Sequence, residues 1–214
     1  MTVLVLAKTP AAGRVKTRLC PPCTPEEAAD VAAAALADTI DVAVRTGAVV
    51  LAVDGVLSGP AGTAVIPQRG VGLGARIAAA FADVGVGPIL LIGMDTPQVT
   101  PALLTSCLSA LDGSVDAVLG PAEDGGWWAL GLHDPLHARL LEDVPMSTPH
   151  TGRNTLAALH AAGLQVRLLP TLRDVDRWID AIAVAGLAPR GRFATAVQRL
   201  ARAYPNDHDR ARCR

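Results

Sequence analysis

Basic side chains gather in the segment that follows the first apolar run of the chain. The segment Ala7–Leu19 reads AKTPAAGRVKTRL and places Arg14, Lys16 and Arg18 within five positions. Diphosphates are bound by several hydrogen-bond donors and positive charges at fixed positions, and Gly13 allows the backbone to approach a ligand closely. We therefore predict a diphosphate-binding loop, although it is neither a Walker loop nor G-x-G-x-x-G. An exposed basic loop is the alternative. The predicted contacts are Ala7, Lys8, Gly13, Arg14, Lys16 and Arg18.

An aspartate follows another apolar run. Asp95 lies just after the expected strand Pro88–Gly93, in the sequence Gly93-Met94-Asp95-Thr96-Pro97. A carboxylate at the end of a strand can ligate Mg²⁺ or Mn²⁺, and such an ion also binds phosphate oxygens. The alternative is a cap for the next helix, but Thr100 is better placed for that. We predict that Asp95 is a metal ligand.

A third candidate is the turn-like stretch GPAEDGGWW at 120–128. Asp124 could bond sugar hydroxyls or act as a catalytic base. Gly125 and Gly126 permit close backbone approach, and Trp127 could pack on the apolar face of a ligand ring. The alternative is a D-G hairpin turn with a core tryptophan, and such a turn can also line a site.

Two weaker candidates complete the set. Asp174-Val175-Asp176 precedes an expected helix, so these carboxylates could reach a metal or cap that helix, and both readings stay open. Gln68, with Gly72 and Gly74 in the turn Gly70–Gly74, could meet a base or ribose.

Other chemistries have less support. Cys20-Pro-Pro-Cys23 lacks the second cysteine pair of a structural zinc site and lies in a proline-rich loop, unlike a thioredoxin-type motif. The histidines show no metal-binding spacing. Ser106 and Ser147 lack a G-x-S-x-G context, so a hydrolase triad is not expected.

These candidates need strands and helices that bring them together, and the apolar pattern predicts such elements. Expected strands are 2–6, 49–53, 64–66, 88–93, 115–119, 127–132 and 165–169. Expected helices are 24–45, 75–84, 100–111, 135–141, 151–162, 177–185 and 192–203. The alternation predicts an α/β fold, with a mostly parallel sheet and helices on both faces. Such sheets bind ligands at the carboxyl ends of their strands, where the candidates lie.

Composition narrows the function classes. The chain has 214 residues, 50% of them hydrophobic and 18% charged, with a net charge of −1. It can bury a large core, and it lacks the basic field of a protein that coats nucleic acid. Apolar runs are too short to span a bilayer, and no signal peptide precedes the first strand, so we expect a cytoplasmic protein. We expect one domain over 1–205 and a flexible basic tail over 206–214.

The ordered set of blocks resembles a known family. Its members are the small bacterial glycosyltransferase-like proteins of the nucleotide-diphospho-sugar transferase superfamily, some of them of the arsenosugar-biosynthesis type. The resemblance extends from Val3 to about Ala185. It rests on these blocks: Ala7-Lys8-Thr9-Pro10, Gly13-Arg14-Val15-Lys16-Thr17-Arg18-Leu19, Gly72-Leu73-Gly74, Gly93-Met94-Asp95-Thr96-Pro97, Gly120-Pro121-Ala122-Glu123-Asp124-Gly125-Gly126 and Asp174-Val175-Asp176.

The resemblance implies a GT-A fold, which is a Rossmann-like three-layer sandwich, with a nucleotide-sugar donor and Mg²⁺ or Mn²⁺ as cofactor. It implies that 14–19 meets the donor diphosphate, that Asp95 binds the metal with Asp176 as a second contact, and that 124–126 lines the sugar or acceptor side. The chain departs from the family where it has Trp127, Met146, Ala75 and Ile179-Asp180 in place of the usual Tyr, Trp, acidic residue and Asp.

Three functions stay open. A metal-assisted glycosyltransferase comes first, with Asp124 as catalytic base if the reaction inverts. A nucleotidyltransferase that joins a nucleoside triphosphate to a phosphorylated molecule and releases pyrophosphate comes second. A non-catalytic nucleotide-binding protein is third, because Met146 and Ala75 depart from the family. The expected partner is a nucleotide or nucleotide sugar, with no nucleic acid and no membrane span, and a homodimer stays open.

Overall fold

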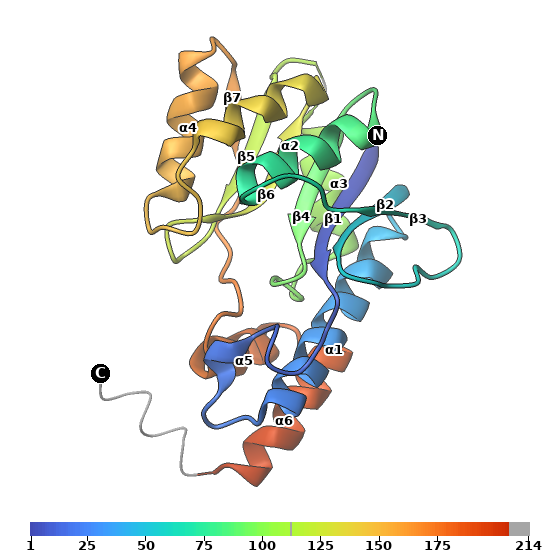
Figure 1. The fold of residues 1–214 in the computed structure, drawn as a ribbon, viewed down its shortest axis with the longest axis vertical. Coiled ribbons are helices and arrows are strands. Elements are labelled where there is room, and N and C mark those ends of the chain that lie inside the picture. The colour runs from blue at the N-terminus through green and yellow to red at the C-terminus, as the bar shows by residue number, and fades with distance from the viewer. Residues whose placement is uncertain (112, 206–214) are drawn as a thin grey trace.

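A seven-stranded mixed sheet forms the centre of the protein (Figure 1). The computed structural model describes residues 1–111 and 113–205, so the predicted tail at 206–214 lies outside the described residues. The strand order is β3-β2-β1-β4-β6-β5-β7. The strands are β1 Thr2–Lys8, β2 Ala48–Asp54, β3 Thr63–Pro67, β4 Ile89–Gly93, β5 Ala117–Pro121, β6 Trp127–Leu132 and β7 Val166–Leu168.

The sheet confirms the predicted fold class. β1 pairs in parallel with β2 and β4, β2 with β3, and β5 with β7; only β6 runs antiparallel, between β4 and β5. β5 and β6 are joined by a turn in which the Gly125 N–H donates to the Ala122 carbonyl over 3.1 Å. A turn this short can only connect antiparallel strands, so the D-G hairpin reading of this stretch is correct.

Helices cover both faces of the sheet, as the alternating pattern predicts. One face packs against α1 Pro25–Ala43 and α3 Pro101–Ser109, and the other against α2 Leu73–Val84, the 3₁₀ segment η2 Pro135–Asp143 and α4 Thr151–Ala161. Val3–Val5 and Ala7 of β1 and the first four residues of β4 are buried, because both faces of these strands are covered. Their continuous apolar sequence is typical of strands in that position.

The predicted helix starts at Thr24 and Thr100 are confirmed. The Thr24 side chain accepts from the Glu27 N–H, and the Glu27 carboxylate accepts from the Thr24 N–H, which is a complete capping box. The Thr100 side chain accepts from the Leu103 N–H over 3.1 Å. Each side-chain oxygen satisfies a backbone donor that the first helical turn leaves free.

Of the two roles left open for Asp174 and Asp176, the cap of the next-to-last helix is wrong. α5 Trp178–Leu187 has Arg177 at its N-cap, and the Asp180 carboxylate accepts from the Arg177 N–H. The two earlier aspartates lie in an extended segment at the sheet edge, one or more residues too far from the helix. A second correction concerns α2, which begins at Leu73 and so takes in part of the turn expected at 70–74.

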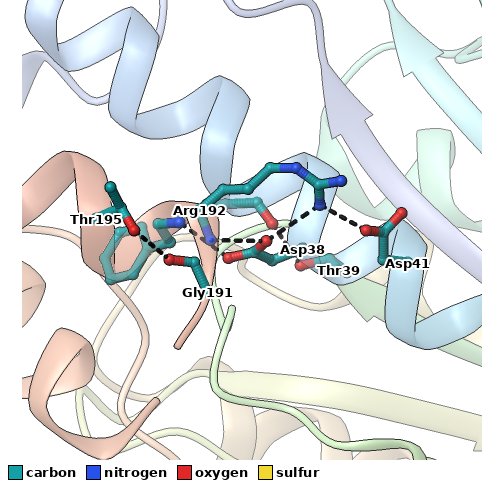
Figure 2. A network of polar contacts seen from close by, with 8 residues as sticks. Asp38, Thr39, Asp41, Gly191, Arg192 and Thr195 are labelled. Atoms are coloured by element: carbon teal, nitrogen blue, oxygen red, sulfur yellow. Dashed lines mark hydrogen bonds and ion pairs between the residues drawn. The ribbon is translucent and has the colours of Figure 1, made fainter. Parts of the chain in front are cut away.

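The last helix is tied to the first by one carboxylate. α6 Arg192–Ala203 packs on α1 and α5 around a third apolar cluster that includes Leu19, Val175 and Phe193. The N-cap of α6 is Gly191, which has no side chain, so Asp38 of α1 accepts from the N–H groups of Arg192 (3.1 Å) and Phe193 (2.9 Å) instead (Figure 2). The Arg192 guanidinium also reaches Asp38 and Asp41.

No helix within 1–111 and 113–205 has the length and apolar character required to cross a membrane.

Candidate functional site

A cavity of about 550 Å³ lies at the carboxyl ends of β1 and β4, and we call it the basic cavity. Five basic side chains line it, against two carboxylates. Its lining residues are Leu6, Ala7, Lys8, Arg14, Val15, Lys16, Thr17, Arg18, Gln68, Gly72, Leu73, Arg76, Gly93, Met94, Asp95, Ser147 and Asp176. The structure therefore brings most of the predicted diphosphate contacts to one hollow, together with both predicted metal ligands.

Lys16 combines an unusual backbone conformation with two side-chain contacts in the basic cavity. Its backbone is left-handed, with φ of 48°, which is unfavourable for a residue other than glycine. Its side chain is only 10% exposed; its ammonium lies 2.6 Å from Asp95 Oδ1 and also donates to the Val175 carbonyl. Strained backbone of this kind persists where surrounding contacts hold it, and here a salt bridge and a hydrogen bond do so.

The other basic side chains of the cavity differ in whether they form ion pairs with carboxylates. Arg18 Nη1 lies 2.6 Å from Asp176 Oδ2, and Arg76 Nη1 lies 2.9 Å from Asp54 Oδ2 at the end of β2. Arg14 and Lys8 are exposed and make no side-chain ion pair within the described chain. Sequence reasoning missed Arg76, whose position one helical turn after Gly72 could have indicated that it reaches the same cavity.

Some predicted contacts do not line the basic cavity. Gly13 lies outside its lining, and Gly74 is buried inside α2, where a Cβ atom would meet the Leu141 carbonyl oxygen at 2.1 Å. Gly74 therefore serves close packing of α2 on η2. Gln68 does line the cavity, but its amide donates to the carbonyls of Ala7 (2.8 Å) and Ala52 (3.0 Å), which leaves only its side-chain oxygen for a ligand.

A second cavity of about 280 Å³ adjoins the first, and we call it the acidic cavity. The two share Leu6, Leu73, Gly93, Asp95 and Ser147. Three aspartates, two tryptophans and several hydroxyl groups line the acidic cavity. Its lining residues are Leu6, Leu73, Ile77, Leu91, Gly93, Asp95, Thr96, Asp124, Gly126, Trp127, Trp128, Met146, Ser147, Thr148, Thr151 and Asp174.

The β5–β6 turn supplies one wall of the acidic cavity. Asp124 is exposed, and its Oδ1 accepts from the Gly126 N–H over 2.7 Å. Gly125 is not in the lining: its φ is +89°, and a Cβ atom there would lie 2.1 Å from the Pro149 carbonyl oxygen. This glycine allows the turn to pack against the segment before α4. Trp127 lies half-buried at the cavity, and Trp128 is buried in the core.

The segment after β7 carries two aspartates to the site. It runs along the end of β5, where the Leu172 N–H donates to the Pro121 carbonyl, and then crosses to Asp95, whose carbonyl accepts from the Val175 N–H over 2.8 Å. Successive side chains of this extended segment point in opposite directions, so the two aspartates on either side of Val175 line different cavities. Asp176 lines the basic cavity and Asp174 lines the acidic one.

The sequence leaves Asp174 open between a metal ligand and a helix cap, and the structure places it in the lining of the acidic cavity. Burial, first, and then the charges of Asp124 and Asp95 raise the pKa of its carboxyl to about 6, although a backbone hydrogen bond and Lys16 act in the opposite direction. A carboxyl whose pKa is raised by burial and by like charges marks a candidate functional group. Only the tertiary structure shows that these three aspartates, which come from three different segments, share one cavity.

The donor set fits a hard divalent ion. Oxygen ligands suit Mg²⁺ and Mn²⁺, and Mg²⁺ is usually held by one or two carboxylates together with substrate phosphates and water. Asp95 with Asp174 or Asp176 provides two carboxylates beside the basic cavity. No group of three or more His, Cys, Asp or Glu side chains able to hold a metal occurs within the described part of the chain. Phosphate oxygens and water would complete the coordination of such an ion.

The C-x-x-C pair takes no part in either cavity. Burial raises the pKa of the Cys23 thiol to about 12, and the pKa of the half-buried Cys20 thiol is also raised, first by burial and then by Glu26 and Glu27. Both thiols therefore stay protonated near neutral pH.

An α/β sheet with a polar site at the carboxyl ends of its strands is typical of nucleotide-binding proteins. Comparison with known proteins identifies the family of this chain. Residues 12–148 match a family described as an uncharacterized protein conserved in bacteria (DUF2064). Because the match covers more than half of the length of this chain, the chain belongs to this family. No curated protein matches the chain.

Solved structures share the fold. A protein of Desulfovibrio desulfuricans G20 assigned as a nucleotide-diphospho-sugar transferase is 23% identical, with a TM-score of 0.82 over 94% of this chain and 95% of that one. Rv0371c of Mycobacterium tuberculosis H37Rv in complex with manganese is 24% identical (TM-score 0.53, 86% and 96%). The 2-C-methyl-D-erythritol 4-phosphate cytidylyltransferase of Thermus thermophilus is 18% identical (TM-score 0.57, 88% and 100%).

Proposed function

We propose that this protein is a transferase that takes a nucleotide-diphosphate sugar as donor and moves the sugar to a second molecule. One observation carries the proposal: a basic cavity and an acidic cavity adjoin at Asp95. The basic cavity suits a diphosphate, and the acidic cavity suits the hydroxyl groups of a sugar. The fold shared with an assigned nucleotide-diphospho-sugar transferase supports the same function.

The residues have separate roles in this proposal. Arg14, Lys8 and Arg18 stabilise negative charge on the departing nucleoside diphosphate, because preorganised cations beside a developing charge lower the barrier. Lys16 holds Asp95 and the Val175 segment in place and contributes its own charge. Asp124, exposed at the mouth of the acidic cavity, accepts the proton of the attacking hydroxyl in an inverting transfer.

A divalent ion, Mg²⁺ or Mn²⁺, would be held by Asp95 together with Asp176 or Asp174. When bound, it would neutralise phosphate charge as a Lewis acid. The neighbouring manganese complex supports a metal in this fold. In the protein alone, Lys16 and Arg18 neutralise Asp95 and Asp176, so the metal must compete with these ion pairs.

Nucleotidyl transfer is the second candidate, favoured by one observation. The fold is also that of a cytidylyltransferase, and the basic cavity has enough charge for a triphosphate. The two reactions release different products. The first consumes a nucleotide sugar and releases a nucleoside diphosphate, whereas the second consumes a nucleoside triphosphate and releases pyrophosphate.

The test begins with binding and ends with products. A thermal-shift screen of nucleoside di- and triphosphates and nucleotide sugars, with and without Mn²⁺, should show stabilisation by a nucleoside diphosphate and its sugar derivatives, because a ligand that binds the folded state raises its stability. Arg14→Gln should weaken this shift, while Arg139→Gln, a matched change at an exposed arginine outside both cavities, should not.

Turnover with the stabilising donors should then release a nucleoside diphosphate. Pyrophosphate release from a nucleoside triphosphate would replace the first candidate with the second. Binding without turnover over the whole donor panel would contradict both and leave a nucleotide-binding protein. Full Mn²⁺-dependent activity in Asp95→Ala would refute the metal assignment.

A further inference from the structure

The basic and acidic cavities meet along a shared wall that has few polar side chains. Asp95 and Ser147 line both cavities, and the other shared residues carry no polar side chain: Leu6, Leu73 and Gly93. Asp95 is paired with Lys16 over 2.6 Å, and an ionised carboxylate only accepts hydrogen bonds. Within the described chain, Ser147 is therefore the side chain of the shared wall that can donate a hydrogen bond to a ligand.

The donors of Ser147 are not used by the protein. This residue is exposed, and neither its hydroxyl nor its backbone N–H has a hydrogen-bond partner within 1–111 and 113–205. The residues around it are held firmly. The Thr148 N–H donates to Thr151 Oγ1 over 3.0 Å, and the Thr151 hydroxyl donates to the Pro145 carbonyl over 3.0 Å. Two free donors consequently stand on a segment whose neighbours are fixed.

The backbone of Ser147 has a conformation that suits glycine better than serine. Its φ is 59°, which is unfavourable for a residue that carries a Cβ atom. In the described chain the other non-glycine residue with positive φ is Lys16, which lines the same basic cavity. Strained residues of this kind gather at functional sites. Stability gives no reason for a serine at this position, so its hydroxyl needs another explanation.

The proposed function places the diphosphate of the donor in the basic cavity and its sugar in the acidic cavity, so the bond between them crosses the shared wall. We propose that Ser147 is a catalytic residue whose hydroxyl donates a hydrogen bond to the phosphate oxygen that leaves the sugar. This inference rests on the proposed function. Negative charge develops on that oxygen as the bond breaks, and a donor fixed beside it stabilises the transition state more than the ground state.

Ser147 keeps its own proton in this step. The bond between the sugar carbon and the phosphate oxygen breaks, and its electron pair stays on the oxygen. The acceptor oxygen forms the new bond to the sugar carbon, and its proton goes to Asp124. In the product, the terminal phosphate of the nucleoside diphosphate lies at the shared wall beside Ser147, whereas a nucleoside monophosphate does not extend that far.

Binding tests this contact without any knowledge of the acceptor. Ser147→Gly and Ser147→Ala both remove the hydroxyl, and Ser106→Ala, at an exposed serine of α3 outside both cavities, is the matched control. Calorimetric titration uses the diphosphate among ADP, CDP, GDP and UDP that stabilises the protein most, and the monophosphate of the same base. Both Ser147 variants should bind the diphosphate about tenfold more weakly and the monophosphate less than about threefold more weakly.

Turnover tests the catalytic role. With a stabilising nucleotide sugar, and with water as acceptor where no other is known, kcat for release of the nucleoside diphosphate should fall by about 100-fold in both Ser147 variants. KM should change by less than about threefold, because the charge on the leaving oxygen develops only in the transition state. Ser147→Gly should have a Tm at or above that of Ser147→Ala, because glycine adopts this φ without strain.

The two variants separate the hydroxyl from the backbone. If Ser147→Gly keeps the activity that Ser147→Ala loses, the backbone conformation is what matters, and the inference is overturned. Wild-type affinity and kcat in both variants would also overturn it while leaving the proposed function intact. If no nucleotide binds the unchanged protein, or if it releases pyrophosphate from a nucleoside triphosphate, the proposed function fails and the role of Ser147 in sugar transfer is refuted with it.

Discussion

Lys16 connects two features that look unrelated in the sequence, a basic loop and an aspartate about eighty residues later. Its ammonium is mostly buried and contacts both Asp95 and the carbonyl of Val175. Lys16→Met should reduce the affinity for a nucleoside diphosphate by about tenfold or more, since a charged hydrogen bond contributes roughly 1.5–3 kcal/mol. Stability should fall by less than about 1 kcal/mol, because the Asp95 side chain is 47% exposed.

Isothermal titration calorimetry and urea denaturation measure these two effects separately. Lys8→Met is the matched control, because Lys8 lines the same cavity without contacting Asp95. If Lys8→Met weakens binding as much as Lys16→Met, then general positive charge explains the site, and the particular position of Lys16 does not.

Asp174 should make stability depend on pH. Its carboxyl pKa is about 6 in the folded protein, against an ordinary value of 3.8, because it is buried near other carboxylates. The folded state then binds this proton more tightly than the unfolded chain, so stability decreases as pH rises from about 4 to about 6 and stays lower above that. Asp174→Asn should therefore raise the Tm by about 2–4 °C above pH 6 and have little effect near pH 4.

Calorimetry from pH 4 to pH 8 in the presence of EDTA measures this difference without bound metal. Asp143→Asn, at an exposed position outside both cavities, is the control for the loss of one carboxylate at the surface. A lower Tm of Asp174→Asn at pH 8 would mean that the folded state stabilises the ionised carboxylate, which contradicts its raised pKa.

At the scale of elements, the β5–β6 turn decides the shape of the acidic cavity. Gly125 combines φ of +89° with a Cβ position 2.1 Å from the Pro149 carbonyl oxygen, whereas Gly163 has φ of +81° and open space around it. Gly163→Ala should reduce stability by about 1–2 kcal/mol, the backbone effect alone. Gly125→Ala should reduce it by roughly 1–3 kcal/mol more, because the turn must also move away from the segment before α4.

Chemical denaturation of both variants gives the comparison, and similar losses would show that the close packing at Gly125 has no energetic weight. The same turn illustrates the limit of sequence reasoning at this scale. The G-G pair was interpreted as a place where backbone approaches a ligand. In the structure Gly125 approaches Pro149, and only its neighbours Asp124 and Gly126 line the cavity.

At the scale of the whole molecule, Asp38 connects the last helix to the first. It is 13% exposed and accepts from two backbone N–H groups at the start of α6, where Gly191 provides no cap. Asp38→Ala should reduce stability by about 1–3 kcal/mol, because it leaves partly buried donors without a partner. Asp41→Ala, which removes only the exposed ion pair with Arg192, should reduce it by less than about 1 kcal/mol.

Hydrogen exchange of the α6 amides, together with urea denaturation, checks this prediction. Equal effects of the two variants would contradict the role of Asp38 as a cap supplied by another helix. The apolar cluster beneath α6 includes Val175, so loosening α6 should also weaken nucleotide binding in Asp38→Ala by a small factor.

Local chemistry and periodicity in the sequence were enough to predict the elements and the sheet edge. Continuous apolar strands, the Thr24 and Thr100 caps and the alternation of strands with helices depend on neighbours in the chain, so they specify the α/β fold and place Lys16, Asp95 and Asp124 at one edge. Asp174 and Asp176 do not form the helix cap that the sequence left open for them, because the course of that segment depends on its hydrogen bond to Asp95, a contact remote in sequence.

Tertiary structure alone determined how the candidates divide between two cavities. Asp174 and Asp176 line different cavities, and Arg76 lines the basic one. Gly74 and Gly125 line neither cavity and instead allow close packing between segments. The physical reason is that charge separation between cavities depends on contacts between segments that are far apart in the chain. Residue type indicates what a side chain can do, but the neighbours that raise its pKa, satisfy its hydrogen bonds or neutralise its charge are set only when the sheet and its helices are assembled.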